Sequence, residues 1–347
     1  MEMVKNPIVS SDCPICSICI ANYNGMGIID AALRSVMRQD FDFPIEIIVH
    51  DDASTDGSDK YIRDNFPDVK LITRSTNVGF CVSNNHMVSK ARGEYILLLN
   101  NDAVLFPDAI RTLYKEARRE NHLAIFGLPQ YNYFSDKLID RGSLFDPFMN
   151  TIPNLDSKID NVGMIIGACF WIPRVLWEEL GGFPEWFHTL GEDIFLCCLA
   201  RLRGYPVKII HSSGFSHRVG NSLGGGKVVA NRLSTSKKRR TFSERNKSFV
   251  MAVTYPAPFF QIIFPFHLAL LFVEGVLLTI VKKDLKLFFS IYISCLKSLW
   301  HERIRLYHLR RDIQWSRRIS SARFFSPFIF IPYKLLMLIK HGVPEIK

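Results

Sequence analysis

The sequence lacks both glycine-rich motifs that commonly bind phosphates in α/β proteins. Its 347 residues contain no G-x-x-x-x-G-K-[ST] and no G-x-G-x-x-G. Their absence excludes the usual backbone cradles for a nucleotide phosphate. A phosphate bound by this chain therefore needs another source of positive charge, and a cation held by carboxylates is the natural candidate.

Cysteines are also few, and their positions exclude two other classes of protein. The eight cysteines are scattered, and residues 1–12 have no apolar stretch of the kind found in secretory signals. We therefore expect no disulfide framework and a reducing cytosol. The segment CPICSIC contains Cys-x-x-Cys twice, but no second Cys/His pair at zinc spacing follows it. We interpret these cysteines as small apolar residues near a strand.

Acidic residues are scarce in the last third of the chain. Residues 1–226 contain 21 Lys and Arg and 27 Asp and Glu, whereas residues 227–347 contain 22 and 6, so the net charges are −6 and +16. Such asymmetry is typical of a folded domain followed by a basic segment with an anionic partner. We predict one domain over residues 1–231 and a membrane-associated helical region over residues 232–347.

The first part of the chain alternates short apolar runs with amphipathic stretches. Between the first two runs, apolar residues recur at helical spacing from Ile28 to Val36. This alternation predicts an α/β fold with a mostly parallel sheet and helices on both faces. The runs expected to be strands are 17–22, 45–52, 69–74 and 94–100.

Polar residues follow the ends of these expected strands. Any single carboxylate there is more often a helix cap or a turn residue, and we assign Asp56 and Ser58 to that role. Because ligands bind at the carboxyl ends of parallel strands, four polar clusters at one edge predict a binding site. The clusters are Asn22-Tyr23-Asn24, Asp51-Asp52, Asn77 to Asn85, and Asn100-Asn101-Asp102.

Five segments, in order, resemble the motifs of family 2 glycosyltransferases, which have the GT-A fold. The segments are SICIANYNG, IEIIVHDDASTDGS, NVGF…NN, ARGEYILLLNNDAVLFPDAI and GEDIFLCCLARLRGYPV. The likeness covers residues 14–225 and is greatest to the rhamnosyltransferase-like branch that builds bacterial surface polysaccharides. It implies transfer of a sugar, with rhamnose as one candidate, from a nucleotide-diphosphate donor to a saccharide acceptor.

The resemblance also implies which residues bind the donor. Asp52 would accept a hydrogen bond from a ring N–H of the base, because a carboxylate only accepts. Gly167 would let the backbone approach the sugar closely. The other residues implied are Ala21, Asn22, Tyr23, Asn24, Gly79 and Asn85. From the residues alone, Tyr23 is equally a core residue, and Asp51 is equally a cap or a turn residue.

A metal site is implied after the fourth strand, where the family usually has Asp-x-Asp and binds Mg²⁺ or Mn²⁺. Asn100 replaces the first carboxylate here, so Asp102 is the ligand carried over and Asn100 is at most a neutral oxygen donor. His217 would contact the metal or the diphosphate, although a lone histidine is more often structural, as we expect for His211. A single carboxylate is compatible with a metal that arrives with the donor.

The segment LGEDIFL contains the residues implied to be catalytic. Asp193 would be the general base of an inverting enzyme, with Glu192 beside it. Apolar periodicity resumes at Ile194, so we expect this pair at a helix N-terminus, where the dipole favours the charged form. Without the other motifs, it is only a helix-start pair. Trp186 and Phe187 are stacking surfaces for an acceptor sugar or, equally, core or membrane-facing residues.

The basic tail combines apolar runs with Lys and Arg. A Glu and a His lie near the middle of the first run, where they are costly in hydrocarbon. We predict re-entrant or surface helices at an anionic membrane, with a hairpin of two spanning helices as the alternative. Nucleic acid would explain the charge but not the apolar runs, so we expect no nucleic-acid partner. The apolar runs are 259–281, 285–300 and 324–340, and the basic clusters are 237–240, 303–311 and 317–323.

The sequence supports one main hypothesis and one alternative. The main hypothesis is an inverting glycosyltransferase at the cytoplasmic face of the cell membrane, which extends a lipid-linked saccharide in cell-surface polysaccharide synthesis. The alternative is a non-catalytic, membrane-tethered module that binds sugar nucleotides. The missing carboxylate at Asn100 favours the alternative, and the intact pair of Glu192 and Asp193 argues against it.

Overall fold

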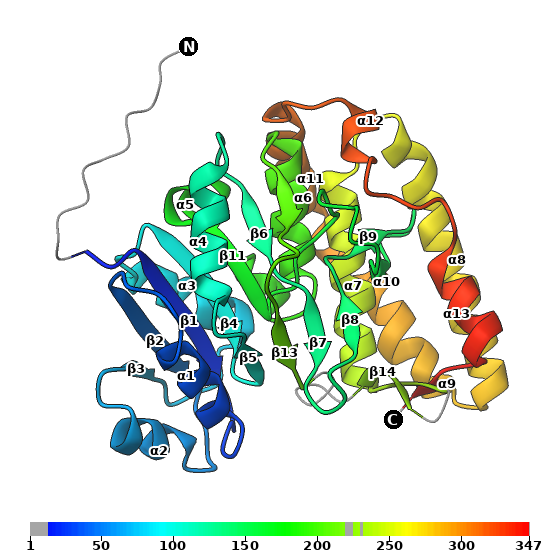
Figure 1. Ribbon diagram of the computed structural model, residues 1–347. Helices are drawn as coiled ribbons and strands as arrows, with labels where there is room; N and C mark the ends of the chain where they lie inside the picture. The colour runs from blue at the N-terminus through cyan, green and yellow to red at the C-terminus, as the bar shows by residue number, and fades with distance from the viewer. Residues whose placement is uncertain (1–12, 219–224, 230–231, 347) are drawn as a thin grey trace.

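The computed structural model describes residues 13–218, 225–229 and 232–346, and its centre is a seven-stranded sheet (Figure 1). The strand order is β12-β6-β11-β4-β1-β2-β3. The strands are β1 (Cys16–Asn22), β2 (Ile45–Asp51), β3 (Lys70–Thr73), β4 (Tyr95–Asn100), β6 (Ile125–Gly127), β11 (Cys169–Pro173) and β12 (Val207–Ile209). The four strands expected from the sequence are β1 to β4, and they lie next to one another in this sheet.

The sheet is mostly parallel, as predicted, and β11 is the exception. β1 pairs in parallel with β2 and with β4, whereas β11 runs antiparallel to both β4 and β6. The strand residues Phe170 and Trp171 are fully buried on opposite faces of the sheet, in two separate apolar clusters. Strands that are buried on both faces read as continuous apolar runs, which is why β1 and β4 show no alternation.

Helices cover both faces of the sheet, which confirms the predicted α/β fold. One face packs against α1 (Ile29–Met37), α2 (Ser58–Asn65) and α4 (Ala109–Arg119). The other face packs against α3 (Phe80–Lys90), α5 (Arg174–Leu180) and α6 (Glu192–Leu202). In α1 the buried residues are Ile29, Ala32, Leu33 and Val36, the stripe that the spacing in the sequence predicts.

A second, four-stranded sheet was not expected from the sequence. Its order is β5-β13-β7-β8, with β5 (Ala103–Leu105), β7 (Gln130–Asn132), β8 (Leu138–Asp140) and β13 (Phe215–His217). β13 lies between β5 and β7, so His217 pairs with Ala103 in register. Two short strands, β9 (Leu144–Phe145) and β10 (Thr151–Ile152), form a separate pair. The second sheet thus brings the late histidine to the end of β4.

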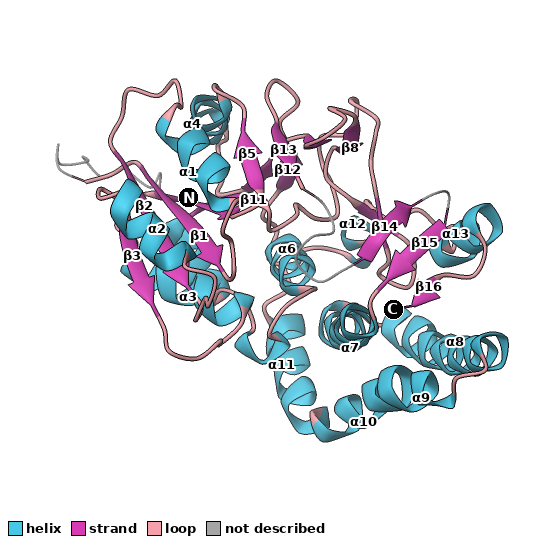
Figure 2. Cartoon of the chain, turned by 90° about the horizontal axis from the view of Figure 1, so that it is seen from below, coloured by secondary structure: helices cyan, strands magenta, loops and turns pink. Residues whose placement is uncertain are grey.

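The C-terminal helices pack against the sheet domain around α7 (Lys237–Thr254), which contacts α6 (Figure 2). The others are α8 (Phe259–Lys282), α9 (Leu285–Leu287), η2 (Phe288–Ile293), α10 (Ser294–His301), α11 (Arg303–Trp315), α12 (Ser321–Phe324) and α13 (Tyr333–His341). Three short strands, β14 (Gly225–Val229), β15 (Arg232–Thr235) and β16 (Glu345–Ile346), form a separate sheet. The apolar cluster that contains Phe170 also contains Phe249 and Ile313. The predicted division at residues 231 and 232 stays a prediction.

Two features of the tail are visible only in the structure. The run 324–340 is not one helix: α12 ends at Phe324 and α13 begins at Tyr333, because Pro327 and Pro332 cannot donate the amide hydrogen bonds of a continuous helix. The basic cluster 237–240 is not an exposed patch either. Arg240 forms an ion pair with Glu274, and among the four residues only Lys238 is fully exposed.

Candidate functional site

The turn after β2 is held by two carboxylates with different partners. The two oxygens of Asp52 accept the backbone N–H groups of Val78 and Gly79, at 2.7 and 2.8 Å. Asp51 instead accepts hydrogen bonds from the side chains of Asn22 and Ser54, so it is a turn residue. Asp52 is 4% exposed. Its carboxylate therefore fixes the loop before α3.

Gly79 lies where no other residue fits. Its φ is +92°, and a Cβ at this position would lie 2.3 Å from Nδ1 of His188. The loop that precedes α3 therefore touches the loop that precedes α6 at Gly79. Asn85 adds a second link between these segments, because its amide donates to the carbonyl of Phe183 and its oxygen accepts the N–H of Phe183. In this structure Asn85 fixes the loop.

The end of β1 is a polar network with one exposed side chain. Asn22 is buried, its amide donates to Asp51 and Ser58, and its oxygen accepts from the amide of Asn101 at 3.0 Å. These bonds join the ends of β1, β2 and β4. Ala21 is half-buried in β1, and the side-chain oxygen of Asn24 accepts the N–H of Thr55. Tyr23 is 53% exposed, so it is not a core residue.

Asp102 and His217 form a buried pair beside the end of β4. Nε2 of His217 lies 3.0 Å from Oδ1 of Asp102, and the side-chain amide of Gln130 lies 2.8 Å from Nδ1 of the same ring. The three side chains come from the turn after β4 and from two strands of the second sheet. Asn100 is half-buried at the end of β4. In the part of the chain that the structure describes, no three His, Cys, Asp or Glu side chains form a metal-binding group.

Asp193 lies at the start of α6, as predicted, and contacts the chain that pairs with β4. Its Oδ2 accepts the N–H of Gly167 at 3.2 Å, and its Oδ1 accepts the N–H of Ile194 at 2.8 Å. The residue after Gly167 accepts, through its carbonyl, the N–H of Asn100. A Cβ on Gly167 would make only ordinary contacts, the nearest at 3.7 Å from Phe80. A short path of backbone bonds thus links Asp193 to Asn100 and Asp102.

Burial, rather than the helix dipole, controls the charge of this acid pair. Burial, together with the negative charge of Asp193, raises the pKa of Glu192 to about 8. Burial also raises the pKa of Asp193, although the N–H groups of Gly167 and Ile194 oppose that shift. The pair begins α6, as expected, and the helix end favours the charged form, but burial has the larger effect on both pKa values, because the effect of a helix end is smaller than that of losing water. The second oxygen of Glu192 has no hydrogen-bond partner among the described residues.

Arg239 is a functional candidate that the sequence reading assigned to the membrane surface. It lies in the first turn of α7, is half-buried, and its positive charge lowers the pKa of both Asp193 and Glu192. Gln130, the partner of His217, was also missed. No signal in the sequence identifies Gln130, whereas the basic run 237–240 marks Arg239 without showing which way it faces.

The aromatic residues before α6 have separate places. Phe187 is fully buried and packs on Phe195 and Phe249, so it belongs to the core. Trp186 is half-buried and packs edge-to-face on Phe187. His211 is structural, as expected, and lies between Arg141 and Asp160.

Sequence comparisons find one family profile and several relatives of parts of the chain. The profile of Glycosyl transferase family 2 matches residues 17–181. An uncharacterized glycosyltransferase of Haemophilus influenzae is 29% identical over 225 residues, which are 62% of this chain and 81% of that protein. An uncharacterized protein of Mycobacterium tuberculosis is 37% identical over 90 residues. That match covers 25% of this chain, and the chain spans only about a quarter (26%) of that relative's length.

Solved structures share the architecture at low sequence identity. Staphylococcus aureus TarS, residues 1–349 in complex with UDP-GlcNAc, is 16% identical with a TM-score of 0.56, over 90% of this chain and 88% of that one. GalNAc-T7 with UDP, GalNAc and Mn²⁺ is 15% identical with a TM-score of 0.57, over 86% and 59%. At these identities the likeness shows the fold. The chain therefore has a GT-A fold, and the profile match assigns residues 17–181, just under half of its length, to glycosyl transferase family 2.

Proposed function

We propose that this chain is an inverting glycosyltransferase that uses a nucleotide-diphosphate sugar. One observation carries the proposal: the carboxylate of Asp193 accepts the N–H of Gly167, and the next residue bonds through its carbonyl to the strand end that bears Asn100. A base for the acceptor and a site for the diphosphate are therefore next to each other at the carboxyl edge of the sheet. Ligands in open α/β sheets bind at this edge.

The donor nucleotide would lie across the ends of β1 and β2. Ala21 to Asn24, Asp52 and Gly79 form this part of the edge, and exposed Tyr23 is available to pack on the base. Each oxygen of Asp52 has a further lone pair beside its bond to the loop, which is free to accept a ring N–H. Asn85 would act indirectly, by fixing α3, and Gly167 would face the sugar.

Asp193 would act as the general base in a single displacement. Its carboxylate takes the proton of the acceptor hydroxyl while that oxygen bonds to the anomeric carbon. The bond from this carbon to the diphosphate oxygen breaks, and the nucleoside diphosphate leaves with inversion. A carboxylate with a raised pKa is a stronger base than an ordinary one, provided that it is ionised at the working pH. Arg239 and the N–H of Gly167 favour that ionised form.

Asp102 and His217 would hold a divalent cation together with the donor. Gln130 fits either tautomer of His217, because an amide carries both a donor and an acceptor, so Nε2 can be freed for a metal. Two protein ligands leave the other positions to phosphate oxygens and water, as Mg²⁺ prefers. When bound, the cation would neutralise charge on the leaving diphosphate. Asn100 would add at most one neutral oxygen.

The test of the base assignment is Asp193→Asn. We expect transfer to fall by at least a thousandfold, since the amide cannot accept the proton, while donor affinity changes little. Isothermal titration with the donor and a coupled transfer assay measure the two quantities. Substantial turnover by Asp193→Asn would contradict the assignment. The donor itself is found by a thermal-shift screen of UDP-, GDP- and dTDP-sugars, in which a preference for dTDP-rhamnose would support the rhamnosyltransferase branch.

A non-catalytic module that binds sugar nucleotides is the second candidate, and the missing carboxylate at Asn100 favours it. The two functions differ in whether the glycosidic bond is broken. Release of nucleoside diphosphate from the donor, measured with and without Mn²⁺, separates them. Binding without any release, in the presence of Mn²⁺ and acceptor saccharides, would support the module.

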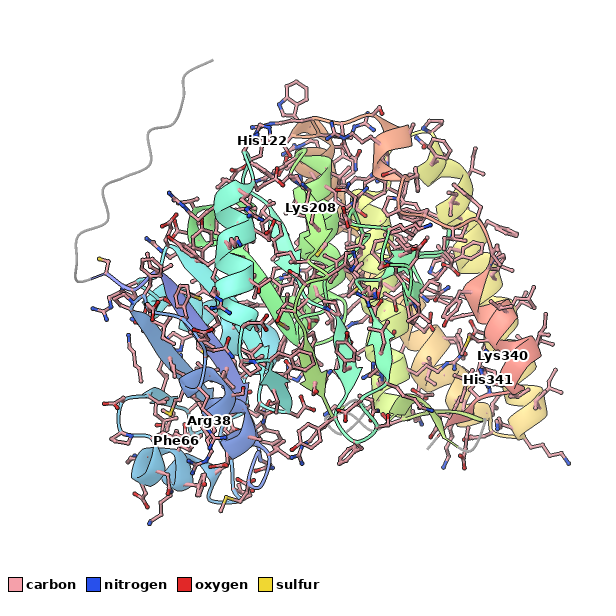
Figure 3. All side chains as sticks on the ribbon, in the orientation of Figure 1. Arg38, Phe66, His122, Lys208, Lys340 and His341 are labelled. Atoms are coloured by element: carbon pink, nitrogen blue, oxygen red, sulfur yellow. The ribbon has the colours of Figure 1, made fainter. Side chains whose placement is uncertain are left out.

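The C-terminal helices would attach the chain to the cytoplasmic face of the cell membrane. α8 is the only helix among the described residues that is long and apolar enough to cross a bilayer, and 22% of its most apolar window is buried. Ile262, Ile280 and Ile339 are each at least 66% exposed, on α8 and on the neighbouring α13 (Figure 1). Lys340 lies at the end of α13 (Figure 3). Exposed apolar side chains beside lysines fit an anionic leaflet.

The polar residues of α8 support a position along the membrane rather than across it. His267 is buried against Ser248 of α7 at 2.9 Å, and Glu274 pairs with Arg240 and with Lys334. These bonds hold α8 against the rest of the protein, and only its outer face is free. Flotation with vesicles, with and without anionic lipid, tests the proposal. We expect binding that weakens with salt, and no binding at all would contradict it.

A further inference from the structure

A cavity of about 480 Å³ lies beside α7, outside the strand-end site. Its wall comes from α7, from the short helix η1 (Glu185–Phe187), from η2 and from α10, with Glu302 at the start of α11. Figure 2 shows α7, α10 and α11 next to one another, and α7 contacts both of the other helices. The proposed function leaves this cavity unused.

The wall of the cavity carries more basic than acidic side chains. Arg245, Lys297 and His301 line it, and Glu302 is its one carboxylate. Glu302 is already paired with Arg305 at 3.0 Å. Arg245 donates to the carbonyl of Phe187 at 2.9 Å, and within the described part of the chain neither it nor Lys297 has a carboxylate at ion-pair distance. Phosphate oxygens would satisfy such groups with charge-assisted hydrogen bonds.

The cavity opens among side chains that suit a membrane surface. Phe289, on its wall, is 56% exposed, and Trp300, Ile304 and Tyr307 on the adjoining helices are 71%, 62% and 66% exposed. Lys297 is exposed beside them. Aromatic and aliphatic side chains among basic residues are typical of the boundary between headgroups and acyl chains. A ligand in the cavity can therefore carry a lipid chain that leaves past Phe289.

The other end of the cavity adjoins the loop before the proposed base. The side chain of Asn246, next to Arg245 on α7, donates to the carbonyls of Phe187, Thr189 and Leu190, the last at 2.6 Å. Asp193 is three residues after Leu190. Along α7, Arg245 is six residues beyond Arg239, or about 9 Å at 1.5 Å per residue. A short saccharide spans this distance.

We propose that this cavity binds the phosphate groups of a lipid-linked saccharide acceptor. The saccharide would extend along α7 towards Asp193, and the lipid would enter the membrane past Phe289. The inference rests on the proposed function, because it places the acceptor of the same reaction. The group bound in the cavity is a phosphate attached to a lipid, and Lys297 and His301 select for that group.

Binding of decyl diphosphate, measured by equilibrium dialysis with the full chain, tests the cavity directly. Saturating UDP and Mg²⁺ occupy the donor site during the measurement. The double variant Lys297→Gln/His301→Gln removes two cavity groups that no described residue holds in an ion pair. We expect affinity to fall by about tenfold or more, with a smaller loss at high salt. Decyl glucoside, which has no phosphate, should bind the variant and the wild type equally.

Two further variants separate a lost contact from a damaged fold. Glu302→Gln removes the one negative charge of the wall and should strengthen binding, whereas disruption of the fold would weaken it. Lys115→Gln removes an exposed positive charge on α4 and should leave binding unchanged. Equal affinity of wild type and the double variant for decyl diphosphate would overturn the proposal, as would an equal loss for decyl glucoside. Binding of anionic vesicles by the wild type without any binding of decyl diphosphate would assign this surface to bulk lipid instead.

Failure of this inference is distinct from failure of the proposed function. If the wild type transfers sugar and the double variant keeps its KM for a phosphate-bearing acceptor, the cavity assignment is wrong and the activity stands. If no donor is turned over while decyl diphosphate binds as expected, the cavity stands and the activity is wrong. The first result comes from the transfer of sugar to an acceptor, and the second comes from the binding of decyl diphosphate.

Discussion

Replacement of Glu192 by Gln should change how the stability of the protein depends on pH. Glu192 is 6% exposed, and its burial raises the pKa from an ordinary value of 4.5 to about 8. The folded protein therefore holds a proton that the unfolded chain releases between these two pH values. Stability from Glu192 is fully present below about pH 4.5 and is lost as the pH rises through 8. The difference in pKa corresponds to about 5 kcal/mol, which coupling to Asp193 and relaxation reduce.

Urea denaturation at pH 5, 7 and 9 measures this effect. At pH 5 we expect Glu192→Gln and the wild type to have similar free energies of unfolding, because both side chains are neutral. At pH 9 the variant should be more stable by roughly 2–5 kcal/mol, since only the wild type then buries an unpaired charge. Asp68→Asn, which removes an exposed carboxylate, serves as the control. An identical pH dependence in Glu192→Gln and the wild type would refute the reasoning.

Three other predictions follow from the site. Gly79→Ala should lower the stability of the fold by about 2 kcal/mol or more in thermal unfolding, because the new Cβ meets the ring of His188. Gly57→Ala is the control. Gly57 has a similar φ of +84° but open space around it, so this variant should lose less stability. Arg239→Gln should shift the acidic limb of the profile of kcat/KM against pH to higher pH by about one unit, because it removes a positive charge that lowers the pKa of Asp193. Lys238→Gln, which changes an exposed residue, should leave this limb in place. An unchanged limb in Arg239→Gln would contradict the assignment. Chelation by EDTA should abolish transfer and Mn²⁺ should restore it, while Mn²⁺ alone should hardly raise Tm unless UDP is present; a large rise without UDP would contradict a metal site completed by the donor.

Much of the fold was predictable because short stretches of the sequence determine the individual strands and helices. The strands β1 to β4 are short apolar runs with turn residues after them, and α1 has a stripe of apolar residues at helical spacing. The second sheet was not predictable, because its strands are three residues each and pair across long intervals, as His217 does with Ala103. Pairing of this kind depends on the whole tertiary structure, and the residues around it show no periodicity of their own.

The candidate site, too, was predicted from the sequence only in part. The motif order in the sequence identified Asp193, Asp102 and His217, and the structure places the last two 3.0 Å apart. The sequence did not show that Gln130 holds the histidine. It also could not show that Arg239 faces the acid pair, because a basic run looks the same whether it faces solvent, lipid or a carboxylate.

By itself, the sequence determined the α/β fold, the family and the edge of the sheet where the polar residues gather, because apolar periodicity and motif spacing are encoded along the chain. Only the tertiary structure decided the charge of the acid pair, since burial sets it and burial depends on α6, α7 and the sheet together. Only the tertiary structure placed Asn100, at the end of β4, within backbone contact of the segment that holds Asp193. Charge and proximity are properties of packed neighbours that lie far apart in the sequence.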